Sequence, residues 1–166
     1  MKLMGRILML LLWSWQAQAT EPVVLTLFGD IRLDERQYER LDFTLSDLQA
    51  MPQGEIITAH PWVSRPHHYR GVDLNRLVTR LFGHRRVETL YMEALNGFSV
   101  AVDWPQVSQL APILAWQDNG KAMSRRNKGP LWLMLPFDRV PKVQQADLLH
   151  FMAWQLRNIK VHSEPQ

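Results

Sequence analysis

The stretch YRGVDLNRL at residues 69–77 contains the clearest helix start in this sequence. Gly71 leads into Asp73, a residue type whose carboxylate caps the free amides of a first helical turn. From Leu74 onward, apolar residues recur at helical spacing, and Gly83 is placed where helices commonly end. The segment therefore predicts a short amphipathic helix between Asp73 and Gly83, with one face buried against the rest of the protein.

Extended segments flank this helix on both sides. Asn96-Gly97 between two apolar runs is typical of a tight β-hairpin. A second short helix is predicted after Thr44, with Asp47 completing its cap and Met51-Pro52 ending it. A third, weaker helix is predicted over 144–151. The predicted strands cover 23–28, 55–58, 87–95, 98–104, 113–117, 131–135 and 154–161.

This order of elements has no regular strand–helix–strand alternation and no repeat. It predicts an α+β protein built around a mixed sheet or a partly rolled barrel, with short helices. Residues 60–70, rich in proline, histidine and aromatic side chains, are expected to form a loop. The tail after His162 is expected to be loose.

The N-terminus has the pattern of a secretory signal peptide. Lys2 and Arg6 precede the apolar run 7–15, and Ala17-Gln18-Ala19 follows it. A membrane anchor is the alternative, but the run is about half of the roughly 20 apolar residues that span a bilayer. We therefore expect residues 1–19 to be cleaved, and residues 20–166 to form one periplasmic domain without membrane insertion.

Composition narrows the classes of function. The net charge is +3, and without Lys2 and Arg6 it falls to +1, so the charge gives no case for nucleic-acid binding. The chain has no cysteine, which excludes disulfides, thiolate nucleophiles and thiolate metal ligands.

The predicted loop 60–70 has the highest density of side chains that could bind a ligand or take part in catalysis. His60, His67 and His68 are candidates for contact with a ligand, together with Trp62 and Arg70. Arg126, in the basic segment 125–128, could hold a phosphate or carboxylate, although a solvated turn explains it too. No fixed metal-ligand spacing is present, and neighbouring histidines on an extended chain point to opposite sides. Ser64 and Ser124 lack the surroundings of a nucleophile, so no catalytic residue is predicted.

Several segments together resemble a known family, the sulfite-oxidase-type oxidoreductase molybdopterin-binding domain. They run from about residue 24 to 161 and comprise FTLSDL (43–48), ITAHPW (57–62), YRGVDLNRL (69–77), the Asn96-Gly97 hairpin, LA (114–115) with DNG (118–120), and GPL (129–131) with Pro136. The resemblance implies an α+β fold with a cleft for a molybdenum–pterin cofactor, whose metal is ligated by one cysteine.

This chain departs from the family's pattern where the chemistry lies. The residue that matches the ligating cysteine, four positions before Trp62, is Thr58, and a hydroxyl is no substitute for a soft thiolate. Asn127 and Trp132 stand where family members carry a histidine and an arginine. In addition, no Arg-Arg pair precedes the apolar run, as export of a preloaded cofactor enzyme would require. The resemblance thus implies the scaffold without its metal.

Two main hypotheses follow. In the first, the protein is a ligand-binding or sensory module without cofactor or metal. It would recognise a small anionic or flat organic ligand, or equally the periplasmic domain of a membrane signalling protein. The alternative is a molybdopterin-dependent oxidoreductase with an atypical ligand set, and a third class is a hydrolase or metal-binding protein that uses His67 and His68. The residues expected to line the cleft are Thr58, His60, Trp62, His67, His68, Arg70, Arg126 and Trp132.

Overall fold

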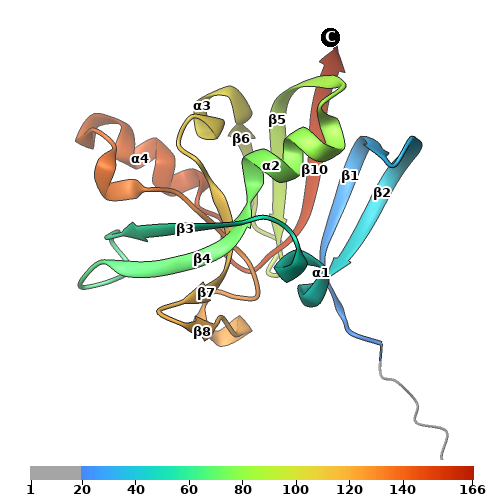
Figure 1. Cartoon of the computed structure of the whole chain (residues 1–166). Helices are drawn as coiled ribbons and strands as arrows, with labels where there is room; N and C mark the ends of the chain where they lie inside the picture. The colour runs from blue at the N-terminus through green and yellow to red at the C-terminus, as the bar shows by residue number, and fades with distance from the viewer. Residues whose placement is uncertain (1–19) are drawn as a thin grey trace, which may run out of the picture.

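The computed structural model describes residues 20–166, and the predicted signal peptide lies outside the described residues. Ten strands form two sheets, with four short α-helices and two 3-10 turns around them (Figure 1). Among the described helices, none combines the length and the apolar character needed to cross a membrane.

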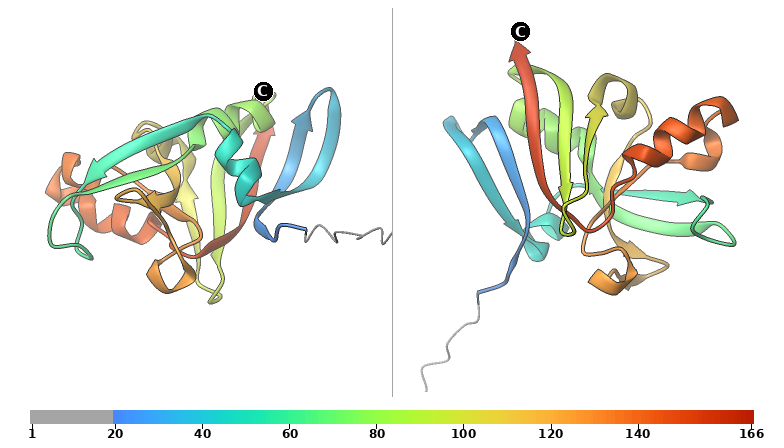
Figure 2. Two further views of the ribbon diagram at one scale, coloured as in Figure 1. Left: turned by 60° about the horizontal axis from the view of Figure 1, so that its bottom comes forward. Right: turned by 180° about the vertical axis from the view of Figure 1, so that it is seen from behind.

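The first sheet has the strand order β2-β1-β10-β5-β6, which can be followed in Figure 2, right. Its strands are β1 (Val23–Leu33), β2 (Arg36–Thr44), β10 (Leu156–Pro165), β5 (Arg85–Ala94) and β6 (Ser99–Asp103). β1 pairs with β10 in parallel, whereas the other pairs are antiparallel. The sheet is therefore mixed, and within residues 20–166 neither sheet closes into a barrel.

The second sheet carries the residues around the predicted site. It comprises β3 (Gln53–Thr58), β4 (His67–Asp73), β7 (Ile113–Asp118) and β8 (Lys121–Ala122), with β9 (Trp132–Met134) paired to β7. The prediction of a loop over 60–70 is wrong for its last four residues. They belong to β4, whose backbone pairs with β3 on one side and β7 on the other.

The helices are α1 (Leu45–Ala50), α2 (Leu74–Phe82), α3 (Trp104–Ser108) and α4 (Lys142–Phe151), with 3-10 turns η1 (Arg125–Asn127) and η2 (Phe137–Arg139). Thr44 and Asp47 form the predicted capping box of α1. Asp73 caps α2 by accepting from the backbone N–H of Arg76 at 3.0 Å. Trp104, expected to end a strand, instead begins α3, because the Asp103 carboxylate caps a turn there.

α2 joins the two sheets. It lies across one face of the first sheet and contacts strands of both (Figures 1 and 2). Its buried face consists of Leu74, Leu77, Val78, Leu81 and Phe82. Each fully buried side chain of this size stabilises the fold by about 1.5–3 kcal/mol. The helix that the YRGVDLNRL stretch predicts is therefore central to the hydrophobic core.

Gly71 in this stretch is required by a close approach of two strands. A Cβ built on Gly71 would lie 2.1 Å from the carbonyl oxygen of Leu114 on β7. The register of β4 against β7 shifts between Arg70 and Gly71, at the same place. No side chain fits there without moving the backbone of β7.

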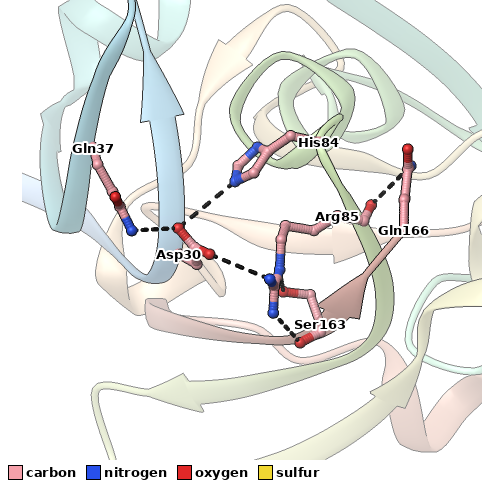
Figure 3. Close-up of polar contacts among 6 residues, drawn as sticks. All are labelled: Asp30, Gln37, His84, Arg85, Ser163 and Gln166. Carbon is pink, nitrogen blue, oxygen red and sulfur yellow. Dashed lines mark hydrogen bonds and ion pairs between the residues drawn. The ribbon is translucent and has the colours of Figure 1, made fainter.

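Polar contacts hold the first sheet together near its C-terminal strand (Figure 3). Asp30 on β1 accepts a hydrogen bond from Gln37 at 2.9 Å and lies 3.5 Å from the guanidinium of Arg85 on β5. Arg85 in turn donates to the carbonyl of Ser163 on β10 at 3.0 Å. The tail after His162 is therefore not loose as predicted, because β10 stays paired with β5 as far as Pro165.

Candidate functional site

Thr58, which the sequence resemblance matches to a ligating cysteine, is closed off from solvent. It ends β3 with a fully buried side chain. Its Oγ1 lies 3.0 Å from a carboxylate oxygen of Asp138 and accepts from the backbone N–H of the same residue at 3.2 Å. The other carboxylate oxygen of Asp138 accepts from the N–H of Ala59 at 3.0 Å. The η2 turn therefore covers Thr58.

These contacts do not fit a molybdenum centre. A metal at this position would need a soft ligand and space for a large pterin. The residue present offers a hydroxyl already held by Asp138, and Trp132, which the sequence resemblance matches to an arginine, is only 2% exposed. In residues 20–166, no three His, Cys, Asp or Glu side chains come together as metal ligands would.

His60 is buried beside this position. Its Nε2 lies 2.8 Å from the hydroxyl oxygen of Tyr69, which is itself fully buried on β4. Desolvation, reinforced by the positive charge of Lys128, lowers the pKa of His60 to about 4. Burial likewise raises the pKa of Tyr69. Both groups are neutral at pH 7, so His60 is a neutral side chain packed against Trp62 and Trp132 and not a cationic contact.

Three tryptophans surround the ammonium group of Lys128. The Nζ atom lies 5.2 Å from the ring centroid of Trp62, 5.0 Å from that of Trp132 and 5.4 Å from that of Trp154. The three indole planes are steeply inclined to one another, at 57° to 86°. They form three walls of a box, an arrangement in which the negative faces of aromatic rings stabilise a cation.

The ammonium group of Lys128 has no carboxylate partner in the described part of the chain, since no acidic oxygen there lies within 4.0 Å of it. Burial lowers its pKa, although the charge of Asp118 opposes this shift. The backbone of Lys128 is left-handed, with φ at 65°. We name the three indole rings around this ammonium the Trp62–Trp132–Trp154 box.

An apolar cavity of about 180 Å³ adjoins this box and shares two of its walls. It is lined by Trp62, Phe98, Leu149, Met152 and Trp154, with Asn96, His150 and Ala153 at its margin. Trp62 is 37% exposed and Phe98 is 42% exposed, so the cavity has a mouth. A cavity of about 150 Å³ is large enough for benzene. The space therefore fits a single aromatic ring or a group of similar size.

The other predicted site residues are divided between two faces of the second sheet. His67 Nδ1 lies 2.8 Å from Asp118, on the face that also holds Tyr69. His68 Nε2 lies 3.0 Å from Glu55 and, with Arg70, is on the opposite face of β4. Arg126 is exposed on η1. The structure thus brings together His60, Trp62 and Trp132, with His67 at the margin, and separates them from His68 and Arg70.

Sequence reasoning missed three important members of this region: Lys128, Trp154 and Asp138. The sequence places Lys128 in an exposed basic segment and predicts Trp154 as the start of a strand. One local signal for Lys128 was available. The residue stands directly before Gly129-Pro130, where the chain turns, and next to a buried strand.

Of three comparisons with known proteins, the one with solved structures finds a match. No family model matches the chain. No curated protein matches it either. Among solved structures, the sulfane dehydrogenase SoxCD from Paracoccus pantotrophus matches with a TM-score of 0.59 and 16% sequence identity. The match covers 85% of this chain but only 38% of that one, so the chain corresponds to less than half of its structural neighbour.

The likeness at this level of identity concerns the fold alone. It agrees with the α+β class that the sequence predicts.

Proposed function

We propose that this chain is a non-redox binding module, exported to the periplasm, that holds a small flat organic anion beside the Trp62–Trp132–Trp154 box. The observation that carries the proposal is the ammonium of Lys128, stabilised by three aromatic faces, without a carboxylate partner in residues 20–166 and next to an apolar cavity with an open mouth.

The ligand class follows from the two halves of the site. The cavity walls are aromatic and aliphatic, so they favour a flat apolar group of about one ring. The ammonium favours a carboxylate or sulfonate attached to that ring, because an ion pair in a partly desolvated place is stronger than one in water. An aromatic carboxylate satisfies both requirements. A cationic ligand is disfavoured, because the positive charge of Lys128 would repel it.

The site at Thr58 argues against molybdenum chemistry as the function. The hydroxyl is held by Asp138 and shielded from solvent, and Trp132 is a buried, uncharged side chain. The proposed binding site is therefore next to this position and not in it. Export to the periplasm is supported only by the sequence pattern of residues 1–19.

Calorimetric titration of the mature domain with benzoate and phenylacetate tests this proposal, with benzamide and phenylacetamide as uncharged counterparts. We expect the carboxylates to bind at one site and the amides to bind at least about tenfold more weakly, a difference of about 1.4 kcal/mol. Lys128→Met keeps the apolar stem and should remove that preference, whereas Lys121→Met, on the exposed β8 strand, should not. Equal binding of acids and amides, or no binding of either, would refute the proposal.

A further inference from the structure

A second apolar cavity, of about 260 Å³, lies between the β1–β2 hairpin and the helices α1 and α2. Figure 1 shows the hairpin beside α2, with α1 at its base. Val72, Leu77 and Leu81 form its buried floor, and Leu33, Phe43 and Met51 are half-buried around it. These three side chains are only partly covered by the protein itself, which leaves the cavity accessible from solvent.

Two arginines stand at the rim of this cavity. Arg76 and Arg80 are one helical turn apart on α2, so both reach over the same edge. Arg76 is exposed and lies 3.5 Å from Asp73, the residue that caps the helix. Arg80 has no acidic oxygen within 4.0 Å in the described chain. A guanidinium group of this kind can take a carboxylate or phosphate in a bidentate pair.

The acidic residues nearest to Arg80 are already bound elsewhere. Asp42 and Asp47 line the same depression as Arg80. Asp42 accepts from Thr26 and from Arg40, and Asp47 accepts from the backbone and side chain of Thr44. The acidic charge reduces the attraction of an anion for this edge but does not neutralise Arg80 by direct contact.

We propose that this cavity binds an acyl chain whose anionic head is held by Arg76 and Arg80. Scaled from the cavity of about 150 Å³ that takes benzene, the volume fits about ten carbon atoms of a chain. A partner helix, about 10 Å across, is too large to enter. The positive charge of the two arginines favours an anionic head, and the volume of the cavity favours a chain of about ten carbon atoms. The ligand class is therefore a medium-length fatty carboxylate, or the equivalent chain of a single-chain phospholipid.

Binding is tested by titrating the mature domain with sodium decanoate below its micelle concentration, with methyl signals followed by NMR. The result expected is saturable binding that shifts the methyl signals of Leu33, Val72, Leu77 and Leu81. Decyltrimethylammonium carries the same chain with the opposite charge, and we expect it to bind at least tenfold more weakly. Equal affinity for the two amphiphiles, or shifts confined to other regions, would overturn the proposal.

Variants test separately the arginines at the rim and the apolar interior of the cavity. Arg76→Gln with Arg80→Gln should weaken decanoate at least tenfold, whereas Arg157→Gln, exposed on β10, should leave it unchanged. Met51→Trp should fill the cavity from its rim and abolish binding, and its melting temperature shows whether it has folded. If the arginine pair leaves the affinity for decanoate unchanged, the assignment of the anionic head is wrong.

A decanoyl lysophospholipid distinguishes the source of the chain. Tighter binding of the lysophospholipid than of decanoate assigns the site to a lipid, and the reverse assigns it to a free fatty acid. Lys128 does not line this cavity, so the proposal is independent of the aromatic site. We therefore expect Lys128→Met to leave decanoate binding unchanged. Failure of one site would therefore be recognised without affecting the other.

Discussion

The hydroxyl oxygen of Thr58 lies 3.0 Å from the carboxylate of Asp138, a residue 80 positions later in the chain. This contact encloses the side chain of Thr58, which is fully buried. It joins the end of β3 to the η2 turn, and the carboxylate also binds the N–H of Ala59. Thr58 is therefore part of the folded core.

Thr58→Val tests the structural role of this contact. Valine has nearly the same shape but removes the partner of the Asp138 N–H and of one of its two carboxylate oxygens, while the other oxygen keeps the N–H of Ala59. We expect a loss of about 1–3 kcal/mol in the free energy of unfolding, measured with urea. Thr79→Val, on the exposed side of α2, is the control and should change it by less than about 0.5 kcal/mol. Equal stability of the two variants would mean that the contact is unimportant.

Protonation of His60 should destabilise the protein in acid. Its pKa is about 4 in the folded protein and 6.5 in the unfolded chain. Between these values the unfolded chain binds more protons, so stability is complete above pH 6.5 and is lost as the pH falls toward 4. The full loss is about 3 kcal/mol.

Chemical unfolding at pH 7 and pH 4.5 measures this effect. His60→Gln should flatten the dependence on pH, whatever its effect on stability at pH 7. His162→Gln, exposed on β10, should keep it. An unchanged slope in His60→Gln would assign the acid sensitivity to other groups.

The tryptophans of the box should separate into structural and binding residues. Trp132 is buried and its indole N–H donates to the carbonyl of Met152 at 3.0 Å. Trp132→Ala should therefore cost about 3–5 kcal/mol of stability. Trp62 is partly exposed, and its replacement by alanine should cost only roughly 1 kcal/mol while removing most of the affinity for an aromatic carboxylate. Comparable losses of stability in both variants would contradict this division.

Gly71→Ala tests the stretch that positions α2. The added methyl would overlap the backbone of Leu114, so we expect a loss of more than about 3 kcal/mol or a failure to fold. Gly97→Asn is the matched control, because Gly97 has a φ of +83° and no atom within 4 Å of a built Cβ. Asparagine tolerates that conformation. Circular dichroism and thermal unfolding distinguish the two outcomes.

Local patterns in the sequence were enough for much of the fold. The capping box of Thr44 and Asp47, the cap of Asp73 and the Asn96-Gly97 hairpin each depend on residues within a few positions of one another. β4 was missed in part because its stability comes from pairing with β3 and with the distant β7. Local composition of its first residues favours a loop, and only tertiary pairing overrides that preference.

The candidate site was less predictable for the same reason. The Trp62–Trp132–Trp154 box draws on three separate parts of the chain, and Lys128 enters it from a fourth. Composition identified Trp62 as an unusual aromatic residue in a polar segment, but nothing local indicates which side chains it meets. Thr58 shows the same limit, because the absence of a cysteine there is visible in the sequence, whereas its contact with Asp138, 80 positions later, is not.

The most direct test of the account follows the indole N–H signals of the tryptophans by NMR during a titration with phenylacetate. The account predicts saturable shifts for Trp62 and Trp154, which wall the cavity, and none for Trp116, whose indole N–H donates to Gln53 elsewhere. The shifts should be lost in Lys128→Met. Shifts that are absent in the unaltered protein, or that persist unchanged in Lys128→Met, would contradict the proposal that an aromatic anion binds beside Lys128.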